Sequence, residues 1–208
     1  GKDVTLIARG KHLEAIRKNG LTIQKLWDES RETLPVKACT AEEYKEIPDV
    51  ILVCIKGYSM DETVPTIKKI AGKETVVIPI LNIYGTGGRL QKKLPELTVT
   101  DGCIYVSANI LEPGVILQHG KILRVVFGAR KPEEETERMR EVAKDMVTDD
   151  LEVILSENIR RDAMVKFSYV SPIGTAGLYC NAVAADFQRE GEQREMFKAL
   201  IREIVALS

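Results

Sequence analysis

Short, continuous apolar runs alternate along the chain with segments of helical character, and this alternation constrains the fold more than any other feature. Runs rich in Val, Ile and Leu predict strands at 4–8, 21–24, 36–39, 49–56, 75–81, 98–100, 122–127 and 151–155. The segments between them predict helices at 11–18, 61–71, 88–93 and 131–146. Continuous apolar strands separated by helices are typical of a parallel sheet covered on both faces. The sequence therefore predicts an α/β, doubly wound parallel sheet.

After residue 155 the pattern becomes entirely helical. Asn158 is a suitable N-cap for the next helix, and Pro172 is expected to break or kink that helix. A last helix carries an apolar stripe at helical spacing, formed by Met196, Phe197, Leu200, Ile201, Ile204 and Val205. We expect two domains, 1–155 with the sheet and 156–208 as the start of an all-helical domain.

Length and charge exclude several classes of protein. The chain has 208 residues, 44% of them hydrophobic, so it can bury a core of its own. Its 30 basic and 31 acidic residues give a net charge of −1, which argues against wholesale binding to nucleic acid or to an anionic membrane. No apolar run approaches the roughly 20 residues that span a bilayer. We expect a soluble protein whose partner is a small molecule.

The cysteines predict a reduced, cytoplasmic chain. Four cysteines lie far apart, without a C-x-x-C pair, and only His12 and His119 accompany them, so no metal site is expected. They are Cys39, Cys54, Cys103 and Cys180. Because Cys54 falls inside an apolar run, we expect a buried and inert thiol there.

Polar residues follow three of the predicted strands directly: Arg9, Lys56 and Asn82. Ligands of open α/β sheets bind outside the carboxyl ends of the strands, so these three side chains are expected to point toward one crevice. Arg9 ends what would be the second strand of a Rossmann-type sheet, where a guanidinium suits the 2′-phosphate of NADP. An ordinary surface arginine is the alternative.

Lys56 and Asn82 also admit two interpretations each. Lys56 either holds a phosphate or a substrate carboxylate, or is a solvated lysine at a strand end. Asn82 either offers its amide to a substrate or to the nicotinamide edge, or it forms a turn. The glycine-rich stretch at 85–88 matches neither phosphate-binding glycine motif, so we interpret it as a loop that enters a helix.

Lys166 is the strongest candidate for a catalytic group. On a helix it shares the apolar face with Ile159, Ala163 and Val170, where a lysine either snorkels or lines a cleft. A lysine ammonium in a partly dry cleft can act as a general acid. The alternative is a surface ion pair with Asp162, four residues earlier.

Five segments resemble the ketopantoate reductases (2-dehydropantoate 2-reductases). They are DVTLIARGKHLEAIRKNGLTI at 3–23, DVILVCIKGYSM at 49–60, PILNIYGTGGRL at 79–90, EPGVILQHGK at 112–121 and MVKFSYVSP at 164–172. The resemblance implies an incomplete Rossmann-type domain followed by part of a helical domain. It also implies NADPH-dependent reduction of ketopantoate to pantoate, on the route to pantothenate and coenzyme A.

The resemblance also implies roles for individual residues. Arg9 would bind the 2′-phosphate of NADPH, and Lys56 would lie beside cofactor and substrate. Asn82 would contact the substrate and the nicotinamide region, and Lys166 would be the catalytic acid. Asn181 is a nearby polar candidate for substrate binding.

The sequence departs from the family pattern in ways that leave alternatives open. The family opens with a strand and a G-x-G-x-x-G turn, and the resemblance implies that this chain begins after that unit. Asparagines often follow the catalytic lysine by four and eight residues, where this chain has Val170 and Gly174. A reductase of another 2-keto acid or imine, and a non-catalytic nucleotide-binding module, therefore remain as alternatives.

Both ends of the sequence look cut, at Gly1 before an apolar run and at Ser208 within a helical pattern. The apolar stripe of the last helix needs a cover. We expect either a homodimer or a further segment of chain to provide it.

Overall fold

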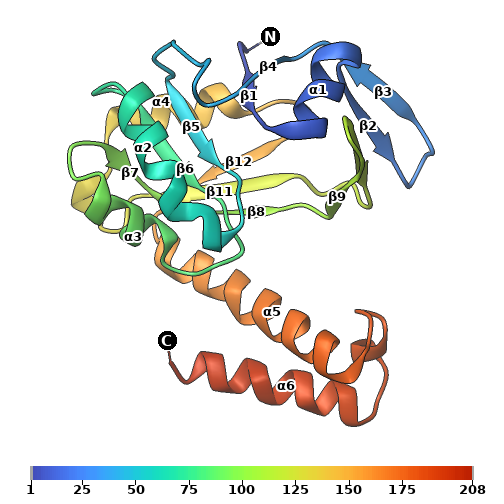
Figure 1. The fold of residues 1–208 in the computed structure, drawn as a ribbon. Helices are drawn as coiled ribbons and strands as arrows, with labels where there is room; N and C mark the ends of the chain where they lie inside the picture. Colours follow the sequence, from blue (N-terminus) through green and yellow to red (C-terminus); the bar gives the residue numbers. More distant parts are fainter. Residues whose placement is uncertain (1, 208) are drawn as a thin grey trace.

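The computed structural model describes residues 2–207, which form a sheet-containing part and a pair of long helices that extends from it (Figure 1). In chain order the elements are β1 (Thr5–Ile7), α1 (Gly10–Asn19), β2 (Leu21–Lys25), β3 (Arg31–Leu34), β4 (Lys37–Cys39), β5 (Val50–Val53), η1 (Gly57–Ser59), α2 (Met60–Ile70), β6 (Val76–Pro79), α3 (Thr86–Lys93), β7 (Thr98–Val99), β8 (Asp101–Tyr105), β9 (Ala108–Glu112), β10 (Val115–Gln118), β11 (Arg124–Gly128), η2 (Pro132–Glu134), α4 (Glu137–Met146), β12 (Glu152–Leu155), α5 (Ile159–Cys180), η3 (Asp186–Gln188) and α6 (Glu192–Val205).

The predicted α/β class with parallel strands is confirmed. β5, β6 and β7 pair in parallel, as do β1 with β4, β2 with β10, and β11 with β12. Three further pairs are antiparallel, namely β2 with β3, β9 with β10, and β8 with β11. Among residues 2–207, β1 hydrogen-bonds only to β4 and β5 only to β6, so each keeps one edge without a neighbouring strand.

β6 forms the centre of the core because it is buried on both faces. Val77 packs with Met60 and Ile67 of α2 and Leu90 of α3. Its neighbours Val76 and Ile78 point the other way, into a cluster that includes Val125 and Phe127 of β11 and Met139 and Val142 of α4. Helices therefore cover both sides of this strand, as the continuous apolar run predicted.

Four strands were not predicted: β3, β8, β9 and β10. β3 and β9 are solvent-exposed along their whole length, so they lack the apolar pattern that marks a buried strand. β9 and β10 form a hairpin around Gly114, whose φ of 81° places it in the left-handed region that favours glycine.

Two helix predictions need correction. α4 begins at Glu137 rather than 131, because the Thr136 hydroxyl caps it by accepting a hydrogen bond from the Met139 N–H. α5 continues through Pro172 to Cys180, so the prediction that this proline breaks the helix is wrong. Pro172 is buried, and packing of α5 against α6 and β8 outweighs the loss of one backbone hydrogen bond.

α5 leaves the sheet part and α6 returns alongside it (Figure 1). The rings of Tyr169 and Phe197 meet edge to face at 5.8 Å, and Phe187 lies 5.2 Å from Phe197. α5 thus covers part of the apolar stripe of α6. Leu178 and Tyr179 remain 89% and 79% exposed, so the pair keeps an apolar surface, and the homodimer stays a prediction.

No helix within residues 2–207 is long and apolar enough to cross a membrane.

Candidate active site

A hydrogen bond between Lys166 and Asn82 connects the helical part to the carboxyl end of the central strand. The Lys166 ammonium donates to the Asn82 Oδ1 over 2.6 Å, although 84 residues separate the two in the sequence. Lys166 lies in the second turn of α5, and Asn82 lies in the loop that follows β6. The structure therefore brings together two of the residues that the sequence singled out.

Lys166 is buried, with 8% of its surface exposed. Burial lowers the pKa of its ammonium below the usual lysine value, because the charged form loses hydration. Two residues of β8 accompany it: the Cys103 thiol, and the Tyr105 ring, whose centroid is 5.6 Å from the Lys166 Nζ. Both have a pKa raised mainly by burial, so they stay neutral around Lys166.

Asp162 is not the partner of Lys166. The Ser156 hydroxyl donates to the Asp162 carboxylate over 2.6 Å, and Arg161 lies 3.4 Å from it. Lys166 forms no ion pair within the part of the chain that the structure describes. The alternative of a surface ion pair between Asp162 and Lys166 is therefore wrong.

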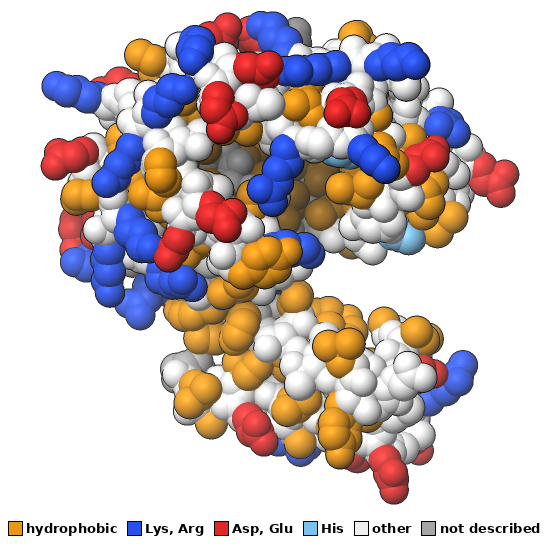
Figure 2. Space-filling model, viewed as in Figure 1, with side chains coloured by type: hydrophobic (Ala, Val, Ile, Leu, Met, Phe, Trp, Pro, Cys, Tyr) orange, Lys and Arg blue, Asp and Glu red, His pale blue; other side chains and the backbone are white. Residues whose placement is uncertain are grey.

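A small pocket surrounds the Lys166–Asn82 contact. Apart from these two residues its walls are mostly apolar or aromatic, formed by Leu81, Ile83, Tyr84, Gly102, Cys103, Ala163, Phe167 and Val170. The centroids of the Tyr84 ring, in the loop after β6, and the Phe167 ring, on α5, lie 6.2 Å apart. Figure 2 shows this face of the molecule hollowed between the sheet part and the α5–α6 pair.

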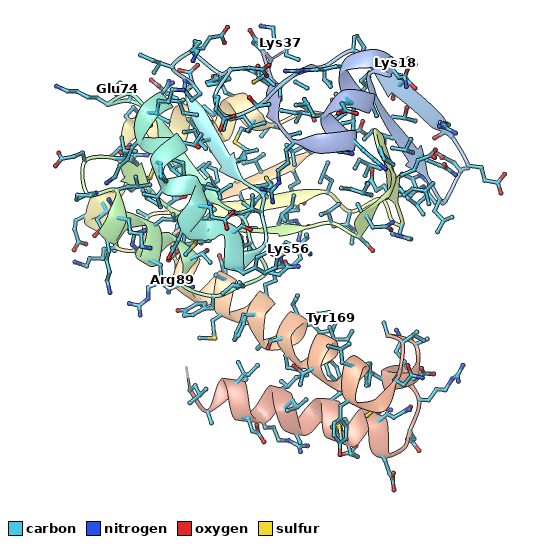
Figure 3. All side chains as sticks on the ribbon, viewed as in Figure 1. Lys18, Lys37, Lys56, Glu74, Arg89 and Tyr169 are labelled. Atoms are coloured by element: carbon cyan, nitrogen blue, oxygen red, sulfur yellow. The ribbon has the colours of Figure 1, made fainter. Side chains whose placement is uncertain are left out.

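Lys56 and Asn82 follow adjacent strands, because β5 and β6 are paired in parallel. Lys56 is exposed and lies on the side of the sheet part that faces α5 (Figure 3). Arg9 is also exposed, directly before α1 and at the end of β1. Neither cation forms an ion pair with another side chain among residues 2–207.

Asn181 lies away from these residues. It caps the carboxyl end of α5 in the left-handed conformation, with φ of 48° and ψ of 48°. Its position is 15 residues beyond Lys166, about 22 Å along a helix that rises 1.5 Å per residue. The structure does not bring Asn181 together with Lys166, and helix termination accounts for an asparagine there.

The glycine-rich stretch enters a helix, as interpreted from the sequence. Gly85 takes a positive φ of 74° before α3, and the Gly87 N–H donates to the buried Asp101 carboxylate over 2.8 Å. A Cβ on Gly87 would meet the Thr100 carbonyl oxygen at 2.0 Å, so only glycine allows this approach. An acidic group at this helix start disfavours a phosphate there.

Two minor predictions concern cysteine and histidine. Cys54 is exposed as a residue, contrary to the expected burial. Loss of hydration around its sulfur nevertheless raises the pKa of the thiol to about 11 and keeps it protonated. His12 and His119 bond to Gly114 and Asn109, respectively. Among residues 2–207 no group of His, Cys, Asp or Glu side chains could hold a metal ion.

Sequence reasoning missed Tyr105 and Cys103. β8 was not predicted as a strand, because its Asp-Gly start is typical of a turn. Had the strand been identified, alternation would have placed both residues on one face, which packs against Ile159 of α5.

A family model described as ketopantoate reductase PanE/ApbA matches residues 1–132, more than half of the chain. The chain belongs to this family. A 2-dehydropantoate 2-reductase of Pyrococcus horikoshii is 32% identical over 179 residues, covering 84% of this chain and 56% of the relative. The chain spans about half the length of the curated relatives it matches.

Solved structures agree with this family. The crystal structure of 2-dehydropantoate 2-reductase from Porphyromonas gingivalis W83 has a TM-score of 0.85 and 29% identity, covering 99% of this chain and 70% of that one. A ternary structure of D-mandelate dehydrogenase has a TM-score of 0.87 at 18% identity, covering 98% and 65%, which shows the fold alone.

Proposed function

We propose that this chain belongs to an enzyme that reduces the ketone of a 2-keto acid with NADPH, and that ketopantoate is its substrate and pantoate its product. The observation that carries the proposal is the buried Lys166 ammonium, held at a strand-end asparagine and free of any carboxylate partner in the described residues. The relatives named 2-dehydropantoate 2-reductase support this substrate.

Lys166 would act as the proton donor. As the ketone is reduced, negative charge develops on its oxygen, and an ammonium beside that oxygen stabilises the charge and supplies the proton. Asn82 holds the Lys166 Nζ in place, and the apolar walls of the pocket limit the access of water. Burial moves the pKa of Lys166 down toward neutral pH, and a general acid is most efficient when its pKa lies near the operating pH.

The residues present fit NADP as the cofactor. Arg9 and Lys56 are exposed cations without ion-pair partners among residues 2–207, so both can meet anionic groups, and a guanidinium suits the 2′-phosphate. The edges of β1 and β5 that carry no neighbouring strand in the described part of the chain would accept a further parallel strand with the glycine-rich turn that the resemblance implies. Bound NADPH would supply the hydride. D-mandelate dehydrogenase binds NADH on the same fold, so NADH is the alternative.

A different 2-keto acid is the second candidate substrate, and Val170 favours it. Val170 lines the pocket one helical turn beyond Lys166, at a position where the resemblance implies an asparagine. Gly174, at the second such position, has open space where a side chain would project. This wall of the site therefore offers no amide to a substrate hydroxyl.

A matched pair of substrates distinguishes the candidates. If ketopantoate is the substrate, the Asn82 amide is the pocket group that can bind its hydroxyl, since Val170 and Gly174 cannot. We then expect a kcat/KM for ketopantoate at least about tenfold above that of the analogue lacking only the hydroxyl oxygen, because a site that binds a hydroxyl rejects a substrate without one. Equal kcat/KM values for the two compounds, or a higher value for the analogue, would indicate that the natural substrate is an apolar 2-keto acid instead. No consumption of NADPH with either would favour a non-catalytic nucleotide-binding module.

A further inference from the structure

The ring of Tyr105 lies next to the Lys166 ammonium, but it does not line the pocket. Its centroid lies 5.6 Å from the Lys166 Nζ, within the range at which an ammonium is attracted to an aromatic face. Tyr105 is half-buried against Cys103, Val126 and Ile159, which fix the ring between β8, β11 and α5. The contact is therefore set by the packing of the sheet against the helix.

The other charged groups near this ring are already engaged. Arg124, opposite Tyr105 on β11, lies 5.9 Å from the ring centroid and pairs with Glu152 of β12 over 2.6 Å. On α5, Asp162 accepts from Ser156 and neighbours Arg161. The ammonium is thus left with two electron-rich contacts, the neutral Asn82 oxygen and the Tyr105 ring, beside the neutral Cys103 thiol.

We propose that Tyr105 is a positioning residue, whose ring face keeps the Lys166 ammonium protonated and directed at Asn82. This inference rests on the proposed role of Lys166 as proton donor. A buried lysine without a carboxylate partner tends to lose its proton, and a lysine that has lost it can no longer act as an acid. The ring attracts the ammonium but not the neutral amine, so it offsets part of the tendency of Lys166 to lose its proton. Tyr105 therefore acts on the reaction only by way of Lys166.

The test is the pKa of Lys166, measured by NMR of protein labelled at the lysine side chains, with the signal assigned by its loss in Lys166→Arg. We expect Tyr105→Leu to lower this pKa by about half to one unit, the size of a partly desolvated cation–π contact. Tyr105→Phe, which keeps the ring, should restore the wild-type value. Tyr169→Leu is the matched control, because it removes a tyrosine of α5, the helix that carries Lys166, and the Tyr169 ring meets Phe197 edge to face rather than contacting Lys166.

A second series guards against misfolding of the leucine variant. Fluorinated phenylalanines at position 105 keep the shape of a ring while weakening the charge of its face, so the pKa of Lys166 should fall stepwise with the number of fluorines. An unchanged pKa across this series would overturn the proposal and leave Tyr105 as a packing residue. The readout requires no turnover, so absence of reductase activity would contradict the proposed function separately.

Discussion

Lys166→Ala is expected to lower kcat for ketopantoate by about 10²-fold or more while NADPH affinity changes little. The lost interaction strengthens only as the ketone oxygen becomes charged, so the loss falls on the chemical step rather than on cofactor binding. Steady-state kinetics and a separate NADPH titration measure the two effects. The buried position of Lys166 and its bond to Asn82 are the physical basis of this expectation.

The pH profile of the wild-type enzyme adds a second check on Lys166. The ammonium is the active form, so kcat should fall as the pH rises through the pKa of Lys166, which burial places below the ordinary lysine value. Lys198→Ala is a suitable control, since Lys198 pairs with Glu195 on the surface of α6. A thermal melt tests whether each variant is folded. An unchanged kcat in Lys166→Ala would remove this residue from catalysis.

Arg9→Ala is expected to weaken NADPH binding by about 1.5–3 kcal/mol, the usual range for a hydrogen bond to a charged group, and to leave NADH binding nearly unchanged. The two cofactors differ only in the 2′-phosphate, so the comparison isolates the contact with that group. Fluorescence titration with each cofactor measures both affinities.

Arg189→Ala is the control for Arg9, because Arg189 is exposed near α6 and pairs with Asp186. It should change neither affinity. Equal weakening of NADPH and NADH by Arg9→Ala would show that the guanidinium contacts a part common to both cofactors, and the preference for NADP would then need another source.

Much of the sheet could be predicted because its central strands are buried on both faces. All four residues of β6 are buried, and a strand buried on both faces is a continuous run of apolar, largely β-branched residues, which is easy to recognise in a sequence. The pairing of β5 with β6 then follows, and with it the adjacency of Lys56 and Asn82. The place of Lys166 on the apolar face of α5 was likewise readable from its spacing to Ile159.

The remainder depended on tertiary contacts that periodicity does not reveal. β9 is an exposed strand held by its hairpin partner β10, so its residues carry no burial pattern. α5 continues past Pro172 because α6 and β8 pack against it. The hydrogen bond between Lys166 and Asn82 joins residues 84 positions apart. The spacing of Asp162 and Lys166 allowed an ion pair as the alternative, and only the structure shows that Asp162 accepts a hydrogen bond from Ser156 instead.

The most direct test of the account is the fate of the hydride. The protein is incubated with ketopantoate and NADPH deuterated at C4 of the nicotinamide, on the face from which hydride leaves, and the product is examined by mass spectrometry. If Lys166 is the proton donor for NADPH-dependent reduction, the wild-type protein yields pantoate carrying deuterium at C2, and Lys166→Ala forms it about 10²-fold more slowly. Pantoate without deuterium, or no pantoate when NADPH is shown to bind, would contradict this account.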